Sequence, residues 1–220
     1  MNISNYLLNE QLVVHRGEMV TLIIENLNEY RKIINSCYLE DFLIEFYEKE
    51  EIIPIKKIEF ISDIYNMDFG DRKIINLINN RISKIMDDEF NDYKTVNIKN
   101  EILNYFSEII LQLDVDIELS SEIKNREFLK SINWKICDCF DTELEKLINY
   151  IDIMIELKDL DIIVTKNAEL FLSSEEIKKL INHLKIKKII FLNIERRHTN
   201  FNVINGRNVV LFDEDLCRVL

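Results

Sequence analysis

Glycine and proline are scarce in this sequence, with 3 Gly and 1 Pro in 220 residues. Such a composition leaves little room for long disordered linkers. The glycines stand alone, at Gly17, Gly70 and Gly206, and no G-x-x-x-x-G-K-[ST] motif occurs. That motif supplies the backbone N–H groups and the lysine that hold the phosphates of a nucleotide. Its absence therefore argues against an active nucleoside triphosphatase.

Cysteine is also infrequent, and Cys37, Cys137, Cys139 and Cys217 are too scattered for a disulfide scaffold in a chain of this size. We interpret them as reduced thiols of a cytoplasmic protein. Cys137 and Cys139 could supply two zinc ligands, but this pair is closer than the usual C-x₂₋₄-C spacing and needs two further ligands. Small buried hydrophobic side chains are the preferred interpretation of these thiols.

Catalytic and membrane-spanning patterns are absent as well. The histidines His15, His183 and His198 never stand in an H-E-x-x-H or nucleophile-elbow context. The charged run from Glu195 to Asn200 could form a catalytic loop, although a solvated turn is the commoner outcome. No apolar run has the length of a membrane span, and the N-terminal residues lack a signal-peptide pattern. We therefore assign no catalytic residue and expect a cytoplasmic protein without a membrane partner.

Acidic residues outnumber basic ones by 40 to 28, which gives a formal net charge of −12. Phosphate contacts need Lys or Arg, so this balance at first argues against a nucleic-acid ligand. Net charge is a weak indicator, however, because a basic surface can lie on an acidic protein and bound cations can invert a local field. The 47% apolar content allows a sizeable core.

The first part of the chain has the pattern of an α/β domain. We expect short strands at Leu12–Val14 and Met19–Ile24, with a turn at Arg16-Gly17 between them. Asn26 or Asn28 can cap a helix that follows the second strand and runs to about residue 36. Two further apolar runs have the length of strands, Phe42–Phe46 and Ile58–Ile61.

The last part of the chain returns to the same pattern. Ser173 and Glu176 have the spacing of a capping box at the start of a helix. A continuous apolar run at Lys187–Ile194 is typical of a strand that is buried on both faces. An Asn205-Gly206 turn predicts a closing hairpin. A helix at Glu143–Leu157 and a strand at Asp161–Thr165 precede these elements.

The middle of the chain has a helical period instead. Asp71–Met86 carries isoleucines at helical spacing, and Val96–Leu113 repeats the pattern. Two long helices in succession predict an antiparallel helical arm. The sequence as a whole therefore predicts an α/β fold, with a head that is P-loop-NTPase-like but lacks the Walker A motif, and an inserted α-helical leg. We place the head at residues 1–64 and 134–220 and the leg at residues 65–133.

An acidic stretch follows the second helix of the leg. Asp116, Glu118, Glu122 and Glu127 lie within it. Alternating carboxylates suit a hard cation such as Ca²⁺, which takes several oxygen ligands in a flexible geometry. The residues alone favour a solvated acidic surface, because runs of charge are usually exposed, and the EF-hand pattern is missing.

A basic surface is expected on the first leg helix. Arg72, Lys73, Arg81 and Lys84 lie roughly opposite its isoleucines, and Asp71 is the one acid in residues 71–86. Such a face could contact phosphates. It could equally be an ordinary solvated helix face, which is the interpretation that these residues favour by themselves.

Several segments together resemble one protein family. Their order and spacing are similar to those of the DNA-end-binding adaptation protein of type II-A CRISPR loci, the Csn-two family. The resemblance spans nearly the whole chain, and each motif is far weaker alone than the ordered set. The segments are TLIIEN (Thr21–Asn26), EFISDIYNMDFGDRKIINLI (Glu59–Ile78), FLSSEEI (Phe171–Ile177), IIFLNIE (Ile189–Glu195) and FDEDLC (Phe212–Cys217).

The resemblance implies a non-enzymatic protein that acts in spacer acquisition, beside the integrase and the effector nuclease of the same locus. It implies a homotetrameric ring that holds double-stranded DNA, entered from a free end, in a basic central hole. It also implies calcium between leg and head, which places Asp116, Glu118, Glu122 and Glu127 as ligands. We expect DNA contacts from basic residues of the arm and the adjoining loop: Arg72, Lys73, Arg81, Lys84, Lys124 and Lys130.

Two alternatives remain open from the sequence. The first is an enzyme that binds a nucleoside triphosphate at a degenerate P-loop-like site. The second is an adaptor whose arm docks a protein partner of the adaptation complex. The strand-to-helix junction at Glu25-Asn26 bears on the first alternative, because it places a carboxylate and a helix-capping side chain where a phosphate would lie.

Overall fold

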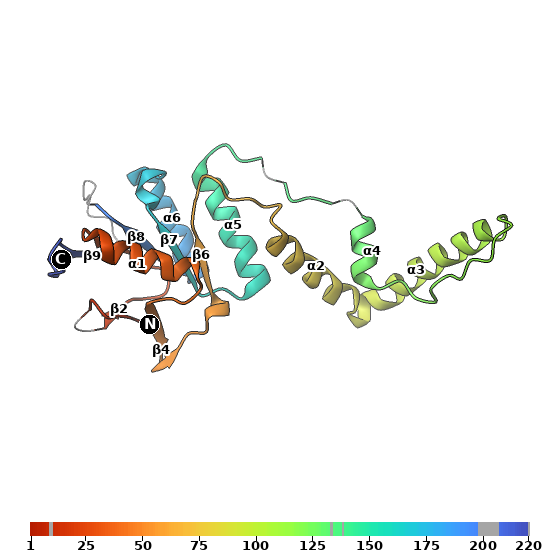
Figure 1. The fold of residues 1–220 in the computed structure, drawn as a ribbon, viewed down its shortest axis with the longest axis horizontal. Helices are drawn as coiled ribbons and strands as arrows, with labels where there is room; N and C mark the ends of the chain where they lie inside the picture. Colours follow the sequence, from red (N-terminus) through yellow and green to blue (C-terminus); the bar gives the residue numbers. More distant parts are fainter. Residues whose placement is uncertain (9–10, 133, 138, 198–206, 220) are drawn as a thin grey trace. The chain divides into compact units, whose positions relative to one another are not determined.

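A computed structural model describes residues 1–8, 11–132, 134–137, 139–197 and 207–219 (Figure 1). The chain divides into two compact units. Unit 1 comprises Met1–Met67 and Asp138–Leu220, and unit 2 comprises Asp68–Cys137. The sequence-based domain boundaries were placed after residue 64 and before residue 134. Unit 1 contains the strands together with helices, and unit 2 contains helices only among its described residues.

A five-stranded parallel sheet forms the centre of unit 1, in the order β6-β7-β8-β3-β9 (Figure 1). All six residues of β3 are buried, and β8 and β9 flank the strand on its two sides. This arrangement confirms the predicted α/β fold with a parallel sheet. The strands are β3 (Met19–Ile24), β6 (Ile58–Ile61), β7 (Ile162–Lys166), β8 (Ile190–Glu195) and β9 (Arg207–Phe212).

A second, antiparallel sheet has the order β2-β1-β4-β5. It consists of β1 (Asn2–Asn5), β2 (Leu12–Val13), β4 (Ile44–Glu48) and β5 (Glu51–Ile52). The sequence prediction missed β1. Arg16 and Gly17 do form a turn, but the strands before and after it, β2 and β3, belong to different sheets. The predicted hairpin through Asn205-Gly206 lies outside the described residues, apart from its second strand, β9.

The two faces of the parallel sheet have different covers. One face packs with α1 (Leu27–Tyr38) and the small sheet, since Ile33, Ile44 and Ile58 share one apolar cluster. The opposite face carries Glu59, whose carboxylate accepts a hydrogen bond of 3.1 Å from the Tyr150 hydroxyl. That tyrosine belongs to α5 (Glu143–Lys158), which lies beside α6 (Ser174–Lys187).

Side-chain caps define where the helices of unit 1 begin. Asn26 caps α1, Thr142 caps α5, and Ser173 forms the predicted capping box with Glu176. Each cap gives partners to N–H groups that a helix start leaves unpaired. At Gly17 the backbone has φ +90°, and a Cβ there would lie 2.7 Å from Lys185 Cα. Glycine at this position therefore allows α6 to approach the turn before β3.

Unit 2 consists of α2 (Arg72–Met86), α3 (Glu89–Ile110) and α4 (Asn125–Ser131). Asp71 caps α2 by accepting a 2.6 Å hydrogen bond from the Lys73 N–H. Figure 1 shows α3 leading away from the end of α2 and not back along it, so the antiparallel pair that we expected is wrong. The second predicted helix begins earlier than expected and ends before Leu113.

Candidate nucleic-acid interface

The carboxyl end of β3 is where a P-loop-like fold would hold a phosphate, and here side chains occupy it. Asn26 Oδ1 accepts hydrogen bonds from the N–H groups of Asn28 at 3.1 Å and Glu29 at 3.2 Å. Its amide nitrogen donates to the Glu214 carbonyl at 2.8 Å. The donors that a helix start offers to an anion are thus partly used by the protein itself, with Glu25 next to them.

The carboxyl end of β8 is also structural. Glu195 Oε1 accepts hydrogen bonds from the Glu169 N–H at 3.1 Å and from the Asn193 amide at 2.8 Å. Asn193 Oδ1 in turn accepts from the Ala168 N–H at 3.0 Å. Burial raises the pKa of Glu195, and these two hydrogen bonds oppose that shift. The pair therefore anchors the short 3₁₀ turn after β7, at Ala168–Leu170.

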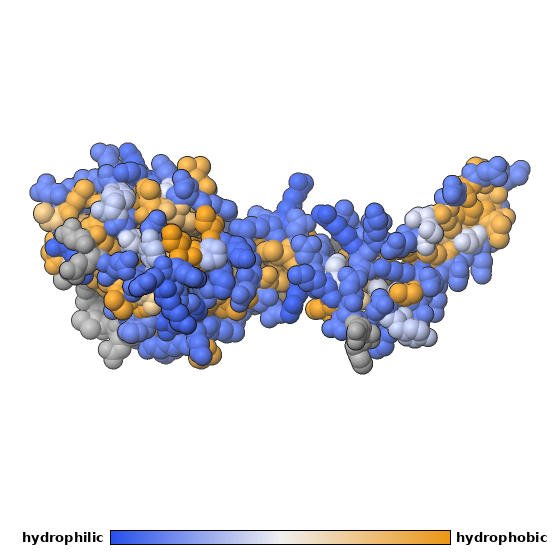
Figure 2. All heavy atoms as spheres, turned by 90° about the horizontal axis from the view of Figure 1, so that it is seen from below, coloured by the Kyte–Doolittle hydropathy of each residue, from blue (hydrophilic) through white to orange (hydrophobic). Residues whose placement is uncertain are grey.

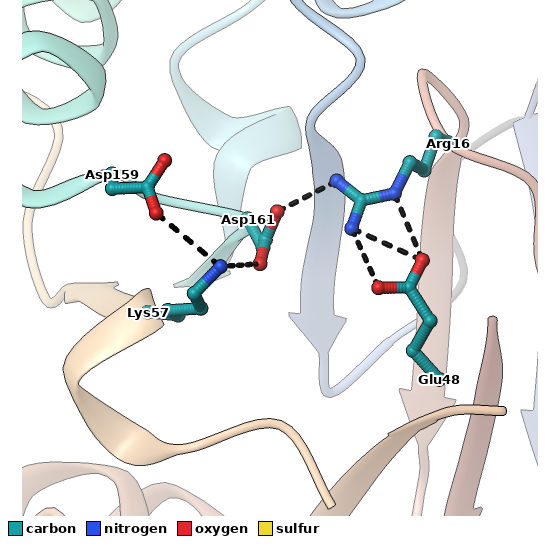
Figure 3. A network of polar contacts seen from close by, with 5 residues as sticks. All are labelled: Arg16, Glu48, Lys57, Asp159 and Asp161. Atoms are coloured by element: carbon teal, nitrogen blue, oxygen red, sulfur yellow. Dashed lines mark hydrogen bonds and ion pairs between the residues drawn. The ribbon is translucent and has the colours of Figure 1, made fainter. Parts of the chain in front are cut away.

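A charged network joins the two sheets at the opposite edge, where the parallel strands begin (Figure 3). Arg16 donates to Asp161 Oδ1 at 2.6 Å and to both Glu48 oxygens, the shorter distance being 3.0 Å. Lys57 Nζ lies 2.9 Å from Asp161 Oδ2 and 3.4 Å from Asp159 Oδ2. Every charged group in the network has a partner. We therefore interpret it as a link between elements and not as a catalytic site.

The same network fixes the ionisation of its carboxylates. The hydrogen bonds from Arg16 lower the pKa of Glu48. Burial of Asp161 would raise its pKa, but hydrogen bonds from Lys57 and Arg16 outweigh burial, and the result is a lowered pKa. Both groups are consequently charged at neutral pH. The hollow beside them, of about 300 Å³, is lined by paired groups and by exposed residues of β5.

The predicted calcium ligands are all exposed. Asp116, Glu118 and Glu122 lie in the irregular segment between α3 and α4, and Glu127 lies in the first turn of α4. Among the described residues, no group of three or more His, Cys, Asp or Glu side chains is arranged to hold a metal ion. The oxygen donors suit Ca²⁺ chemically, but one chain does not bring them together. Calcium binding remains a prediction.

The six predicted DNA-contacting residues are exposed on unit 2. Arg72 and Lys73 begin α2, while Lys84 lies in its last turn. The helix itself contains no acid, so its surface is strongly basic. Arg81 also lies on α2, Lys124 is the N-cap residue of α4, and Lys130 lies in the last turn of α4.

Helix α6 carries a basic surface that the sequence prediction missed. Lys178, Lys179, Lys185, Lys187 and Lys188 are all exposed. The apolar residues of α6 were recognised from their spacing, but the lysines between them were not considered. The signal was present, because residues 177–194 contain five lysines and no Asp or Glu.

The thiols and histidines do not form a reactive site among the described residues. Cys137 and Cys139 are exposed, so the prediction that they are buried hydrophobic side chains is wrong. Cys37 is buried, and burial raises the pKa of its thiol to about 12. His183 on α6 lies 2.9 Å from Asp152 on α5. His198 lies outside the described residues, as does the rest of the charged run Glu195–Asn200 after Arg197.

Comparison with known proteins decides the family. The model of the CRISPR-associated protein family Cas_Csn2 matches residues 38–216. The chain belongs to this family. The match confirms the resemblance found in the sequence, and membership in Cas_Csn2 implies a CRISPR-associated role in adaptation. None of the described helices is long and apolar enough to cross a membrane.

Individual relatives agree with the Cas_Csn2 assignment. CRISPR-associated protein Csn2 of Streptococcus agalactiae is 23% identical over 220 residues, covering 96% of each chain. The crystal structure of Stu0660 of Streptococcus thermophilus aligns with 88% of this chain and 68% of its own, at 13% identity and a TM-score of 0.52. A putative ABC transporter (ATP-binding protein) from Pyrococcus furiosus aligns with 91% of this chain and 88% of its own, at 13% identity. Its TM-score of 0.40 is too low to support an argument.

Proposed function

We propose that this chain is a non-catalytic DNA-binding protein of CRISPR spacer acquisition that holds the free end of double-stranded DNA within a homotetrameric ring. The observation that carries the proposal is the Cas_Csn2 match over residues 38–216. The described site supports it in two ways. The edge of the sheet that would bind a nucleotide is used for structural hydrogen bonds, and unit 2 presents a basic helix, α2, to solvent.

The basic helix suits a ligand that is read through its phosphates. Arg72, Lys73, Arg81 and Lys84 give α2 four positive charges and no negative ones. Contacts of this kind bind DNA without sequence preference and weaken steeply as salt rises, because bound counterions are released. Four copies around one duplex would multiply these contacts. A chain with a net charge of −12 could in this way bind a polyanion.

Assembly into a ring is supported by the apolar surface of α3. Val96 is 43%, Ile98 48% and Phe106 49% exposed, and Tyr105 is 61% exposed. Figure 2 shows hydrophobic residues gathered at the surface of this end of unit 2. Exposed apolar clusters on a soluble chain commonly mark contact surfaces. A second copy of the chain is the partner that the proposed ring requires.

Calcium is part of this proposal because of four exposed acids, three of them between α3 and α4 and the fourth, Glu127, in the first turn of α4. Their oxygens are suitable donors, and copies assembled in a ring could complete what one chain leaves open. A test is isothermal titration with CaCl₂ on the wild type and on Glu118→Gln/Glu122→Gln. The matched control is Glu51→Gln/Glu175→Gln, which removes two exposed acids of unit 1. Equal calcium heats in all three proteins would refute this part.

The central experiment compares a linear duplex with the same duplex as a closed circle, with calcium and with a chelator. Multi-angle light scattering follows the oligomer in parallel. We expect a tetramer and tighter binding of the linear form when calcium is present. A stable monomer that ignores both DNA forms would refute the proposal. Calorimetry with ATP and Mg²⁺ tests the degenerate-nucleotidase alternative, and we expect no heat of binding.

The exposed apolar surface of α3 also supports a second candidate function. In this function the chain is an adaptor that docks the integrase or the effector nuclease of the same locus. Charge reversal at Arg72, Lys73, Arg81 and Lys84 separates the two functions. Loss of DNA binding supports the ring. Intact DNA binding together with loss of integrase in a pull-down favours the adaptor.

A further inference from the structure

We propose that the exposed lysines of α6 form a second phosphate-contacting surface, on unit 1, in addition to the one expected on α2. The surface consists of Lys178, Lys179 and Lys185, with Asn182 between them, and is called the α6 lysine face here. The inference rests on the proposed DNA-binding function. Its ligand is the phosphate backbone of double-stranded DNA.

The spacing of α6 sets these side chains apart from the core. Ile177, Leu180, Ile181 and Leu184 are buried, at most 3% exposed. Lys178 and Lys185 are seven residues apart, so they lie on the same side of the helix, two turns apart. At a rise of 1.5 Å per residue their Cα atoms are separated by about 10 Å. Two lysines at that separation can reach two phosphates of one duplex at the same time.

The helix that carries the face is firmly held. Ser173 and Glu176 close its start with a capping box, and the Lys188 N–H bonds the Leu184 carbonyl at its end. Gly17 allows close backbone contact at Lys185, where a Cβ would come within 2.7 Å of Lys185 Cα. The lysines therefore extend from a fixed backbone. Fixing the backbone in advance reduces the entropy cost of binding a ligand.

The charge pattern distinguishes this face from an ordinary solvated helix surface. Solvated helix faces commonly alternate charges of opposite sign at spacings of three or four residues. Glu175 and Glu176 stand at such spacings before Lys178 and Lys179 at the start of the helix, but no acid occurs between Glu176 and Glu195, so Lys185 has none on its own helix. Lys187 is paired with Asp152 at 3.0 Å, while Lys178 and Lys185 form no ion pair with any residue that the structure describes. On a chain of net charge −12, two such lysines on one face are complementary to an anionic ligand.

The test uses Lys178→Gln/Lys185→Gln in the full chain. Its matched control is Lys49→Gln/Lys56→Gln, which removes two exposed lysines of unit 1 that belong to other elements. Both variants change the net charge equally. Binding of a linear blunt duplex is measured between 50 and 200 mM salt, and circular dichroism and the melting temperature check the fold.

We expect the α6 variant to bind about tenfold or more weakly at low salt, with a slope of log K against log salt smaller by about 2, since each lost phosphate contact removes about 0.9. The control should bind like the wild type. Lys178→Arg/Lys185→Arg keeps both charges and should retain binding, which excludes a purely structural loss.

Two results are distinguishable from each other. If the wild type binds no DNA, the proposed function fails and the inference fails with it. If the wild type binds DNA and the α6 variant matches it in affinity and salt slope, the inference alone is overturned. That second result is also the one expected if the face serves an acidic protein surface instead.

Discussion

Individual buried carboxylates hold unit 1 together, each through a different kind of partner. Glu59 pairs with Lys158 and accepts from Tyr150. Asp161 forms ion pairs with Arg16 and Lys57. Glu195 accepts hydrogen bonds from a backbone N–H and from a side-chain amide. A buried charge is costly unless such partners are present, so removing one partner should cost more than removing an exposed ion pair.

Asp161→Asn is expected to lower the free energy of unfolding by about 1–3 kcal/mol, because two cations lose their shared charged acceptor. The lowered pKa of Asp161 gives the sign of the pH effect. Its stabilisation is present above the unfolded-state pKa and is lost as pH falls through the lower folded-state pKa. Urea unfolding at pH 7 and pH 3 measures this, and the variant should lose less on acidification than the wild type. Exposed Asp41→Asn should behave like the wild type at both pH values.

Lys158→Met leaves Glu59 as a buried charge without its cation. The two side chains are only 17% and 4% exposed, so water screens the pair little. We expect a loss of about 3–5 kcal/mol, and recovery of part of it in Glu59→Leu/Lys158→Met, where neither charge is left. Guanidinium unfolding of the three proteins measures both effects. A single variant as stable as the wild type would contradict the prediction.

At the scale of elements, the sequence predicted those whose signals are local. The bounds of β3 and β6 match the expected ranges, and the caps Asn26 and Ser173 were both among the expected residues. Apolar runs and caps depend on neighbours within one turn, which a sequence contains directly.

Partners in space were predicted less well. β2 and β3 lie in different sheets because β2 pairs with β1, whereas β3 pairs with β8 and β9. Such pairings depend on other parts of the chain and not on the residues next to each strand. The apolar period of α3 predicted a helix correctly, but period alone does not name the surface that covers it. The same limit applies to the calcium acids, whose oxygens were recognised by type, while their positions in space depend on the chain around them.

Gly17→Ala tests the contact between the turn before β3 and helix α6. The added Cβ meets Lys185 Cα at 2.7 Å, and the backbone is in the left-handed region. We expect a loss of about 1–3 kcal/mol, which corresponds to a melting temperature lower by about 2–4 °C per kcal/mol. Gly70→Ala is the matched control, because its nearest neighbour is the Asp68 carboxylate at 3.1 Å and its φ is not positive. Equal melting temperatures for the two variants would contradict this account.

At the scale of the whole molecule, charge is separated by segment. The chain carries a net charge of −12, yet α2 has no acid and residues 177–194 have none either. Basic helices on an acidic protein allow it to bind a polyanion locally while the rest of its surface repels other polyanions. The function proposed above depends on this separation and not on the net charge.

Tyr105→Ser/Phe106→Ser tests the proposed assembly. Both rings are about half exposed or more on α3, so their loss should cost little in one chain but should remove apolar area from a contact between copies. We expect light scattering to show species smaller than the tetramer, with circular dichroism unchanged. Leu39→Ser, at a leucine of unit 1 that is 77% exposed, should leave the oligomer intact. An unchanged tetramer in the α3 variant would argue against this surface.

The position of β3 in its sheet also has a consequence for biosynthesis. Met19 pairs with Phe191 and Arg207, so β3 is made long before either of its neighbouring strands. At roughly 5–20 residues per second, a ribosome needs on the order of ten seconds or longer to deliver β8 and β9. During that time Met19–Ile24 has neither flanking strand, and its apolar side chains lack their final cover. The nascent chain is therefore expected to be a chaperone client until translation is nearly complete.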